Sequence, residues 1–155
     1  MSASKAPVPY IILVALFLAG CTESAKDGQS EDCFVQSGGE RVFFGSPECL
    51  AQFDTELMNG YWLVDFETSL FFPTEEALER GSIDSAYSLD FLDTPSGEVS
   101  ALRDAPSERA FRVSFEGSKS ETPGIYGRVP DLRGGVVVKG NFSIEGEIAD
   151  VPTTH

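Results

Sequence analysis

Three cysteines are the residues of this 155-residue chain best suited to chemistry: Cys21, Cys33 and Cys49. A cysteine thiol can be acylated, oxidised to a disulfide, or bound as a thiolate to a soft metal ion such as Cu(I). The choice among these depends on the compartment, because disulfides persist only where thiols are oxidised. The segment that precedes Cys21 indicates the compartment.

That segment is typical of an export signal. Lys5 supplies a positive charge, and an apolar run follows that is shorter than the roughly 20 residues a membrane-spanning helix needs. The run ends at Leu18-Ala19-Gly20-Cys21, which resembles the lipobox of bacterial lipoproteins. The resemblance implies a signal peptide over residues 1–20 and an acylated Cys21. Thr22, where an aspartate would favour the inner membrane, implies an anchor in the outer membrane. The alternatives are a plain membrane anchor or an ordinary secretory signal.

Acylation of Cys21 leaves Cys33 and Cys49 in an oxidising compartment. We expect these two residues to form a disulfide. For a loop of this length, the lost entropy of the unfolded chain would stabilise the folded protein by about 3 kcal/mol. The alternative is a soft-metal site with two thiolate ligands.

Other candidates for catalysis are few. The single histidine is His155, the last residue, so no Ser-His-Asp triad or histidine-rich zinc site can be assembled from the folded region. Asp65 and Glu67 would share a face on a strand and could hold a hard cation or do acid chemistry. A solvated outer strand face explains the same pair. We therefore expect no enzyme and no cofactor, with copper as the alternative cofactor.

The charge of the chain limits its partners. The formal net charge is −14 at pH 7, from 11 basic and 25 acidic side chains. Such a surface repels nucleic acid and anionic lipid headgroups, because binding to polyphosphates depends on basic side chains that displace counterions. We expect no nucleic-acid partner, and the membrane attachment must come from the acyl chains.

The region before Gly60 divides into a tether, a hairpin and a helix. Residues 22–32 are small and polar and are predicted to be a tether. The turn sequence Ser37-Gly38-Gly39 between apolar residues predicts a short hairpin. Ser46, Pro47 and Glu48 are typical of a helix start. The predicted helix runs for about ten residues. Leu50, Phe53 and Leu57 recur at helical spacing, and Asn59-Gly60 is predicted to end the helix.

From Gly60 onwards, apolar and polar residues alternate as they do in strands. Strands are predicted over 61–73, 87–91, 111–117 and 136–148, with a short helix at 74–80 and loops at 93–109 and 118–133. In the first strand, even-numbered residues from Trp62 to Phe72 would share one face. Gly134-Gly135 and Gly140 predict bends or bulges. The fold class is mainly β: a small OB-like barrel, or else a compact β-sandwich.

Residues 33–57 resemble the YHS/TRASH type of small metal-handling module. The positions that match this family are the aromatic pair Phe43-Phe44 followed by Ser46, Cys49 and Phe53. Cys33 would stand for the family's earlier cysteine. Gly45 stands where the family has its middle cysteine. The resemblance implies soft-metal binding by Cys33 and Cys49.

Two further resemblances point to lipoproteins of the cell envelope. Val64-Asp65-Phe66-Glu67-Thr68 is similar to a stretch of the copper-chaperone lipoproteins of nitrous oxide reductase maturation, although their methionine-rich signature is absent. Gly60-Tyr61-Trp62 and Val113-Ser114-Phe115-Glu116-Gly117 are similar to the OB-type domain of NlpE-type envelope-stress lipoproteins. The second resemblance implies a binding domain and carries over no catalytic residue.

We therefore expect a non-catalytic binding or adaptor lipoprotein of the outer membrane, facing the periplasm or the cell surface, that acts in envelope maintenance or stress sensing. Its partner would be an envelope protein or a small ligand. The alternative is a copper-handling lipoprotein. Tyr126, Arg128 and Arg133 lie in the long 118–133 connection and are the predicted partner contacts. The expected segments are the signal peptide 1–20, the lipidated tether 21–32, a cysteine-containing segment 33–59, a β domain 60–150 and a tail 151–155.

Overall fold

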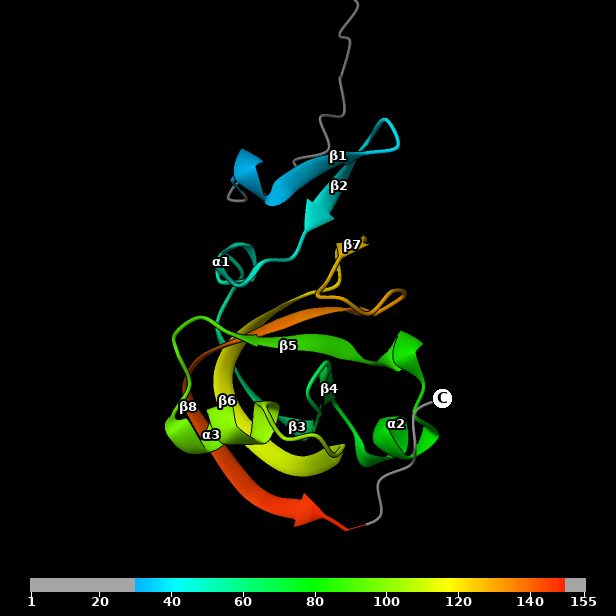
Figure 1. Ribbon diagram of the computed structural model, residues 1–155. Coiled ribbons are helices and arrows are strands. Elements are labelled where there is room, and N and C mark those ends of the chain that lie inside the picture. Colours follow the sequence, from blue (N-terminus) through cyan, green and yellow to red (C-terminus); the bar gives the residue numbers. More distant parts are fainter. Residues whose placement is uncertain (1–29, 150–155) are drawn as a thin grey trace, which may run out of the picture.

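The computed structural model describes residues 30–149. The predicted signal peptide, Cys21, most of the predicted tether and His155 lie outside the described residues. The described chain forms a five-stranded closed barrel with a smaller three-stranded sheet above it (Figure 1). Its elements are η1 (Glu31–Cys33), β1 (Phe34–Ser37), β2 (Glu40–Phe44), α1 (Pro47–Leu50), β3 (Glu56–Val64), β4 (Ser69–Phe72), α2 (Glu75–Arg80), η2 (Ile83–Ser85), β5 (Tyr87–Phe91), α3 (Gly97–Arg103), β6 (Arg109–Ser120), β7 (Gly124–Ile125) and β8 (Gly134–Ile148).

The barrel closes in the order β3-β4-β5-β8-β6, with β6 returning to β3. All neighbouring pairs are antiparallel except β5 and β8, which are parallel. Counted along the chain, the strand order is therefore 1-2-3-5-4, and α3 lies between the third and fourth strands. This is an OB-like arrangement. The prediction of a small OB-like barrel is confirmed, and the sandwich alternative is excluded.

The barrel encloses an aromatic core. Trp62 is fully buried, and its ring lies 5.9 Å from that of Phe111 and 5.5 Å from that of Phe142. A second cluster lies on the other side of β3, where α2 covers Leu63 and Phe72. Because β3 is buried on both faces from Gly60 to Val64, alternation in this half of the strand separates two apolar clusters rather than core from solvent.

The predicted strand over residues 61–73 is wrong, since this segment is a hairpin of β3 and β4. The chain turns at residues 65–68, and Trp62 pairs with Phe71 across the hairpin. This register reverses the parity, so Phe71 joins Trp62 in the barrel core whereas Phe72 joins the second cluster. Side chains alternate between two faces in both strands, so the sequence pattern does not reveal the tight turn between β3 and β4.

The predicted ten-residue helix is also wrong. α1 has four residues, capped by the Ser46 hydroxyl, and β3 begins at Glu56. The spacing of the apolar residues suggested a helix, but Leu57 is 69% exposed while Met58 pairs with Phe115 of β6. Non-local pairing with a long neighbouring strand outweighs a local helical pattern here.

Other short elements follow the sequence more closely. Gly38 and Gly39 both have positive φ and form the predicted turn between β1 and β2. The short helix predicted at 74–80 is confirmed as α2, which is capped by Thr74 and ends at Gly81 in the left-handed conformation. The irregular ladder between β6 and β8 includes the pair Glu116 and Gly140, so the expected bulge near Gly140 is confirmed. The predicted 93–109 loop contains α3, whose Val99 packs against the barrel core.

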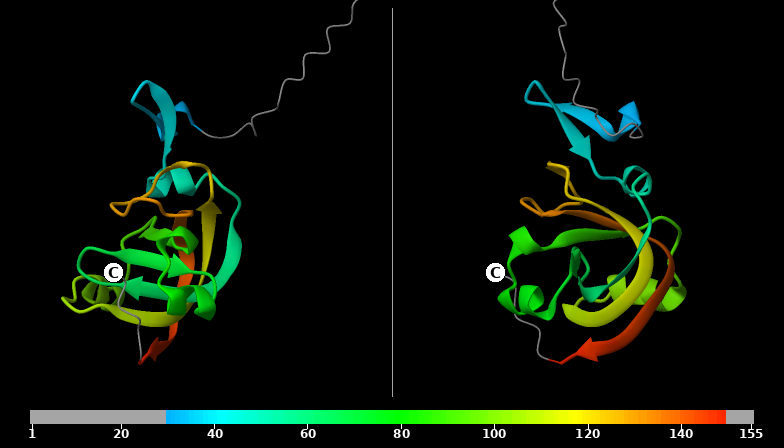
Figure 2. Two further views of the ribbon diagram at one scale, coloured as in Figure 1. Left: turned by 90° about the vertical axis from the view of Figure 1, so that its right-hand side faces the viewer. Right: turned by 180° about the vertical axis from the view of Figure 1, so that it is seen from behind.

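The three-stranded sheet packs directly on the barrel. β2 pairs in parallel with β7, which comes from the connection between β6 and β8. Cys33, Phe43 and Leu50 share a cluster with Tyr126 and with Val137 of β8. The end of the predicted tether also belongs to this unit, because Glu31 and Asp32 form η1 and Glu31 pairs with Arg41. Two further views show this unit at one end of the barrel (Figure 2).

Candidate binding groove

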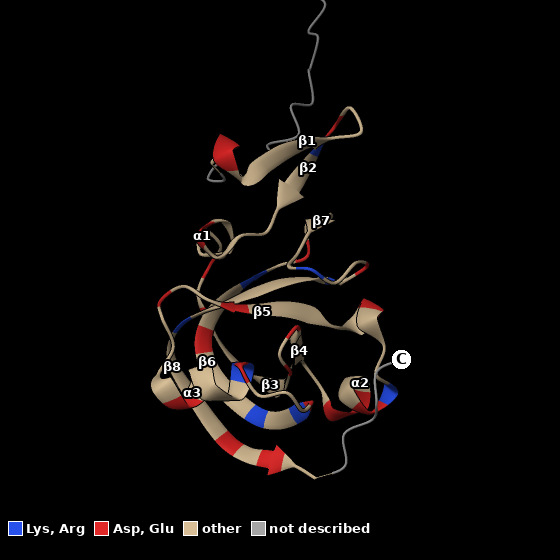
Figure 3. Ribbon diagram, in the orientation of Figure 1, with Lys and Arg blue, Asp and Glu red and all other residues tan. Residues whose placement is uncertain are grey.

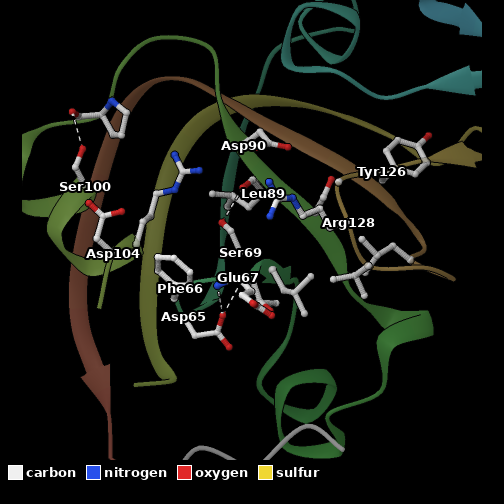
Figure 4. A pocket seen from close by; sticks show the side chains of 18 of the residues that line it. Asp65, Phe66, Glu67, Ser69, Leu89, Asp90, Ser100, Asp104, Tyr126 and Arg128 are labelled. Carbon is white, nitrogen blue, oxygen red and sulfur yellow. Dashed lines mark hydrogen bonds between the residues drawn. The ribbon is translucent and has the colours of Figure 1, made fainter. Parts of the chain in front are cut away.

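A groove of about 600 Å³ opens on the side of the barrel formed by β4 and β5 (Figure 4). Three loops border it: the β3–β4 turn, the segment that leads into α3, and the connection between β6 and β8. Its volume lies within the range of small-molecule sites. The lining side chains used below are Asp65, Phe66, Glu67, Ser69, Ser88, Asp90, Arg103, Asp104, Tyr126 and Arg128.

The groove exists because β4 and β5 pair over only a short distance. Their ladder has two pairs, Leu70 with Ser88 and Phe71 with Tyr87. Beyond them a side chain joins the strands: the Ser69 hydroxyl donates to the Leu89 carbonyl at 2.7 Å and accepts from the Trp62 indole N–H at 3.0 Å. The β3–β4 hairpin ends there, while β5 continues to Phe91. The remainder of β5 lines the groove.

Ser88 supplies an unsatisfied polar group at the groove. Ser88 is 4% exposed, and its hydroxyl oxygen has no hydrogen-bond partner within residues 30–149. Buried hydroxyls are normally hydrogen-bonded, and an unpaired one costs free energy. The unpaired Ser88 hydroxyl is therefore a group that a bound ligand could satisfy.

Asp90 lies two residues further along β5 and is partly buried. Burial raises the pKa of its carboxyl group, the Glu48 carboxylate adds to the rise, and the Arg103 guanidinium opposes it. Within the described chain its carboxylate makes no hydrogen bond or ion pair with another residue. Asp90 therefore offers two acceptor oxygens in a partly desolvated position.

The β3–β4 turn presents an aromatic ring at the groove. The Asp65 carboxylate accepts hydrogen bonds from the backbone N–H groups of Glu67 (2.7 Å) and Thr68 (2.6 Å), which fixes the turn. Phe66, between these residues, is 72% exposed. Asp65 and Glu67 thus lie in a turn and not on a strand face, so the strand geometry predicted for a carboxylate pair is wrong.

The predicted partner contacts have three different environments. Arg128 is exposed and lines the groove. Tyr126 is 3% exposed, and its hydroxyl hydrogen-bonds to the Thr122 carbonyl while its ring packs near Phe43. The prediction that Tyr126 is an exposed contact is wrong: it anchors the connection and contributes only to the groove wall. Its ring requires glycine at 135, where a Cβ would lie 2.5 Å from it.

Arg133, the third predicted contact, lies outside the groove. It forms an ion pair with Glu121 at 3.2 Å and lies over the Tyr87 ring. It lines a smaller hollow of about 320 Å³ together with Arg80 and Asp84. Arg128 and Arg133 therefore do not converge on one surface.

The predicted disulfide between Cys33 and Cys49 is confirmed, with a Cα–Cα distance of 5.5 Å. Both cysteines are buried, and the Gln52 amide donates to the Cys33 sulfur at 3.3 Å. In this oxidised form neither sulfur is a thiolate. Gly45, at the family's middle-cysteine position, has no room for a side chain, because a Cβ there would lie 2.3 Å from the Tyr126 ring. Residues 30–149 contain no group of three or more His, Cys, Asp or Glu side chains placed to hold a metal ion.

Sequence reasoning missed Phe66, Ser88, Asp90, Arg103 and Asp104 as groove residues. Ser88 and Asp90 follow the polar positions of an alternating strand and looked solvated. Arg103 and Asp104 fell in a segment predicted to be a loop. Only an OB-like strand order, combined with the loops it brings together, would have singled out these positions.

No family model, no curated protein and no solved structure was found to match this chain. Among residues 30–149, none of the helices has the length and apolar character needed to span a bilayer.

Proposed function

We propose that this chain is a non-catalytic binding lipoprotein of the bacterial outer membrane, anchored through an acylated Cys21. Its barrel would bind a ligand or partner in the groove between β4 and β5 and so serve envelope maintenance or stress sensing. The groove is the observation that carries this proposal. The anchor rests on the export segment and lipobox-like sequence that end at Cys21.

The position of the groove supports a binding role. In OB-type barrels, ligands are bound by the face of the second and third strands and by the loops that join strands one to two and four to five. The corresponding parts here are β4, β5, the 65–68 turn and the connection from β6 to β8. This support is an analogy between folds, so the residues of the groove must provide the test.

The charge distribution limits the kinds of partner that the protein can bind. Figure 3 shows acidic residues on α1, α2, α3 and β8, and the net charge is −14. A field of this sign disfavours nucleic acids and other polyanions. The copper-handling alternative has no groove residue in its favour and requires reduction of the Cys33–Cys49 disulfide.

Site-specific photo-crosslinking in living cells tests the proposed site. A benzophenone amino acid would replace Phe66 at the groove or, as the control, Leu57, which is similarly exposed on β3 outside the groove. We expect a defined crosslinked species from position 66 that is lost in Asp90→Asn or Arg128→Ala, and none from position 57. Equal products from both positions, or none from position 66, would reject the groove as the site.

Mass spectrometry of the membrane fraction tests the anchor separately. We expect an N-terminal acylated Cys21 and release of the Cys21→Ser chain from the membrane. An unmodified N-terminus after residue 20 would reject the lipoprotein assignment and leave the groove unaffected.

A further inference from the structure

We infer that the groove binds a neutral oligosaccharide. This inference rests on the proposed function, which makes the groove the ligand site, and adds the chemical class of the ligand. Four features of the groove support it: an unsatisfied buried hydroxyl, interspersed donors and acceptors, an exposed aromatic ring and the balance of its charges.

The first feature is the hydroxyl of Ser88. It is buried, lines the groove and has no partner in the described chain. A hydroxyl can both donate and accept. A sugar hydroxyl can meet it in either sense, so binding would satisfy a group that the free protein leaves unpaired.

The second feature is the mixture of side chains around Ser88. The carboxylates of Asp90 and Asp104 only accept hydrogen bonds, whereas the guanidinium group of Arg128 only donates. Within the described residues, neither the carboxylate of Asp90 nor the guanidinium of Arg128 forms an ion pair or a side-chain hydrogen bond. A ligand rich in hydroxyl groups matches both kinds, because each hydroxyl is donor and acceptor at once.

The third feature is the ring of Phe66. At 72% exposure it is the most exposed large apolar side chain in the described chain. The bonded 65–68 turn fixes its backbone, so little conformational freedom is lost on contact. A flat apolar ring beside polar groups suits a sugar, which has an apolar C–H face and polar edges.

The fourth feature is charge. Four carboxylates line the groove, from Asp65, Glu67, Asp90 and Asp104, and they repel an anionic ligand. Arg103 and Arg128 are interspersed with them and oppose a polycation. A neutral ligand is repelled neither by the carboxylates nor by the guanidinium groups. A cationic ligand is the main competing outcome of the test.

The inference is tested by calorimetric titration of the full mature lipidated chain in detergent micelles. The probes are two neutral trisaccharides, the β-1,4-linked trimers of N-acetylglucosamine and of glucose. Spermidine is the cationic comparison. We expect saturable binding of at least one trisaccharide with little dependence on salt, because no ion pairs form. Binding of spermidine alone, weakening steeply with salt, would overturn the inference.

Three variants sharpen this test. Phe66→Ala should weaken trisaccharide binding by about tenfold, while Leu57→Ala should leave it unchanged. Ser88→Ala should weaken binding several-fold yet leave the melting temperature of the free protein unchanged or higher, since it removes an unsatisfied hydroxyl. Equal weakening by Leu57→Ala, or unaltered affinity in both groove variants, would contradict the proposed contacts.

The outcome also separates the two proposals. If neither trisaccharide binds but position 66 still gives a crosslinked species that depends on Asp90, the oligosaccharide inference fails and the proposed binding site stands. If the crosslinking and the titrations both fail, the groove is not the binding site.

Discussion

Two sides of the barrel differ in how their strands are joined. On one side, all nine residues of β3 pair with β6, and β6 continues its pairing with β8 past several bulges. On the other side, β4 and β5 share only two ladder pairs and the Ser69 bridge. The sparsely paired side holds the groove. Under the proposed function, the densely paired side would serve stability and the sparsely paired side would serve binding.

The largest predicted effect is at the core beneath the paired side. Trp62→Ala should lower the free energy of unfolding by about 3–5 kcal/mol, because it empties a fully buried site between Phe111 and Phe142. Urea unfolding followed by circular dichroism measures it. A loss below about 1 kcal/mol would mean that this core does not dominate stability.

The disulfide should come next. Replacing both Cys33 and Cys49 by serine should cost about 3 kcal/mol through the loop-closure entropy of the unfolded chain. The same urea experiment, with dithiothreitol-treated wild type as the control, checks it. An unchanged midpoint after reduction would show that the disulfide between η1 and α1 contributes nothing to stability.

A smaller effect is expected at the Ser69 bridge. Ser69→Ala removes the link from Trp62 to Leu89 and leaves the indole N–H unpaired, so we expect a loss of about 1–2 kcal/mol. Ser114→Ala, on the fully paired β6, is the matched control and should change stability by less than about 0.5 kcal/mol. Equal losses at the two serines would remove the distinction between the two sides.

The smallest effect is a pH dependence at Asp90. Its folded-state pKa is raised, chiefly by burial, so the folded protein holds this proton more tightly than the unfolded chain does. Stability therefore falls as pH rises from the ordinary aspartate range through the raised pKa. Asp90→Asn should raise the melting temperature at pH 7, and the gain should vanish at acidic pH. A gain that is the same at every pH would contradict this origin.

The sequence predicted the barrel because alternation within each strand is local. Tyr87, Leu89 and Phe91 alternate with polar residues, and they form the predicted strand. The disulfide was predicted from the expected oxidising compartment and the number of cysteines. The predictions that failed depend on non-local contacts. Pairing of Trp62 with Phe71 turns the predicted single strand into a hairpin, and pairing of Met58 with Phe115 places a strand where a helix was predicted. Residue types alone do not reveal such partners.

The site was less predictable than the fold. Of the partner contacts predicted in the 118–133 connection, Arg128 lines the groove. Tyr126 is buried instead, and its burial depends on Gly45 and Gly135, which no local pattern reveals. Asp90 lines the groove because β4 stops short of it, whereas Ser88 still pairs with Leu70 of β4 at the end of the short ladder. A groove that opens where a strand lacks a partner along one edge has no signature in the sequence of that strand.

The most direct test of the groove is amide hydrogen exchange of the full mature chain, with and without the N-acetylglucosamine trimer. In the free protein we expect β5 from Ser88 to Phe91 to exchange faster than β3 from Met58 to Leu63. On binding, exchange should slow in β5, in the 65–68 turn and around Arg128, and remain unchanged in the β6–β8 ladder. Protection confined to that ladder or to the β1–β2 hairpin would contradict the account.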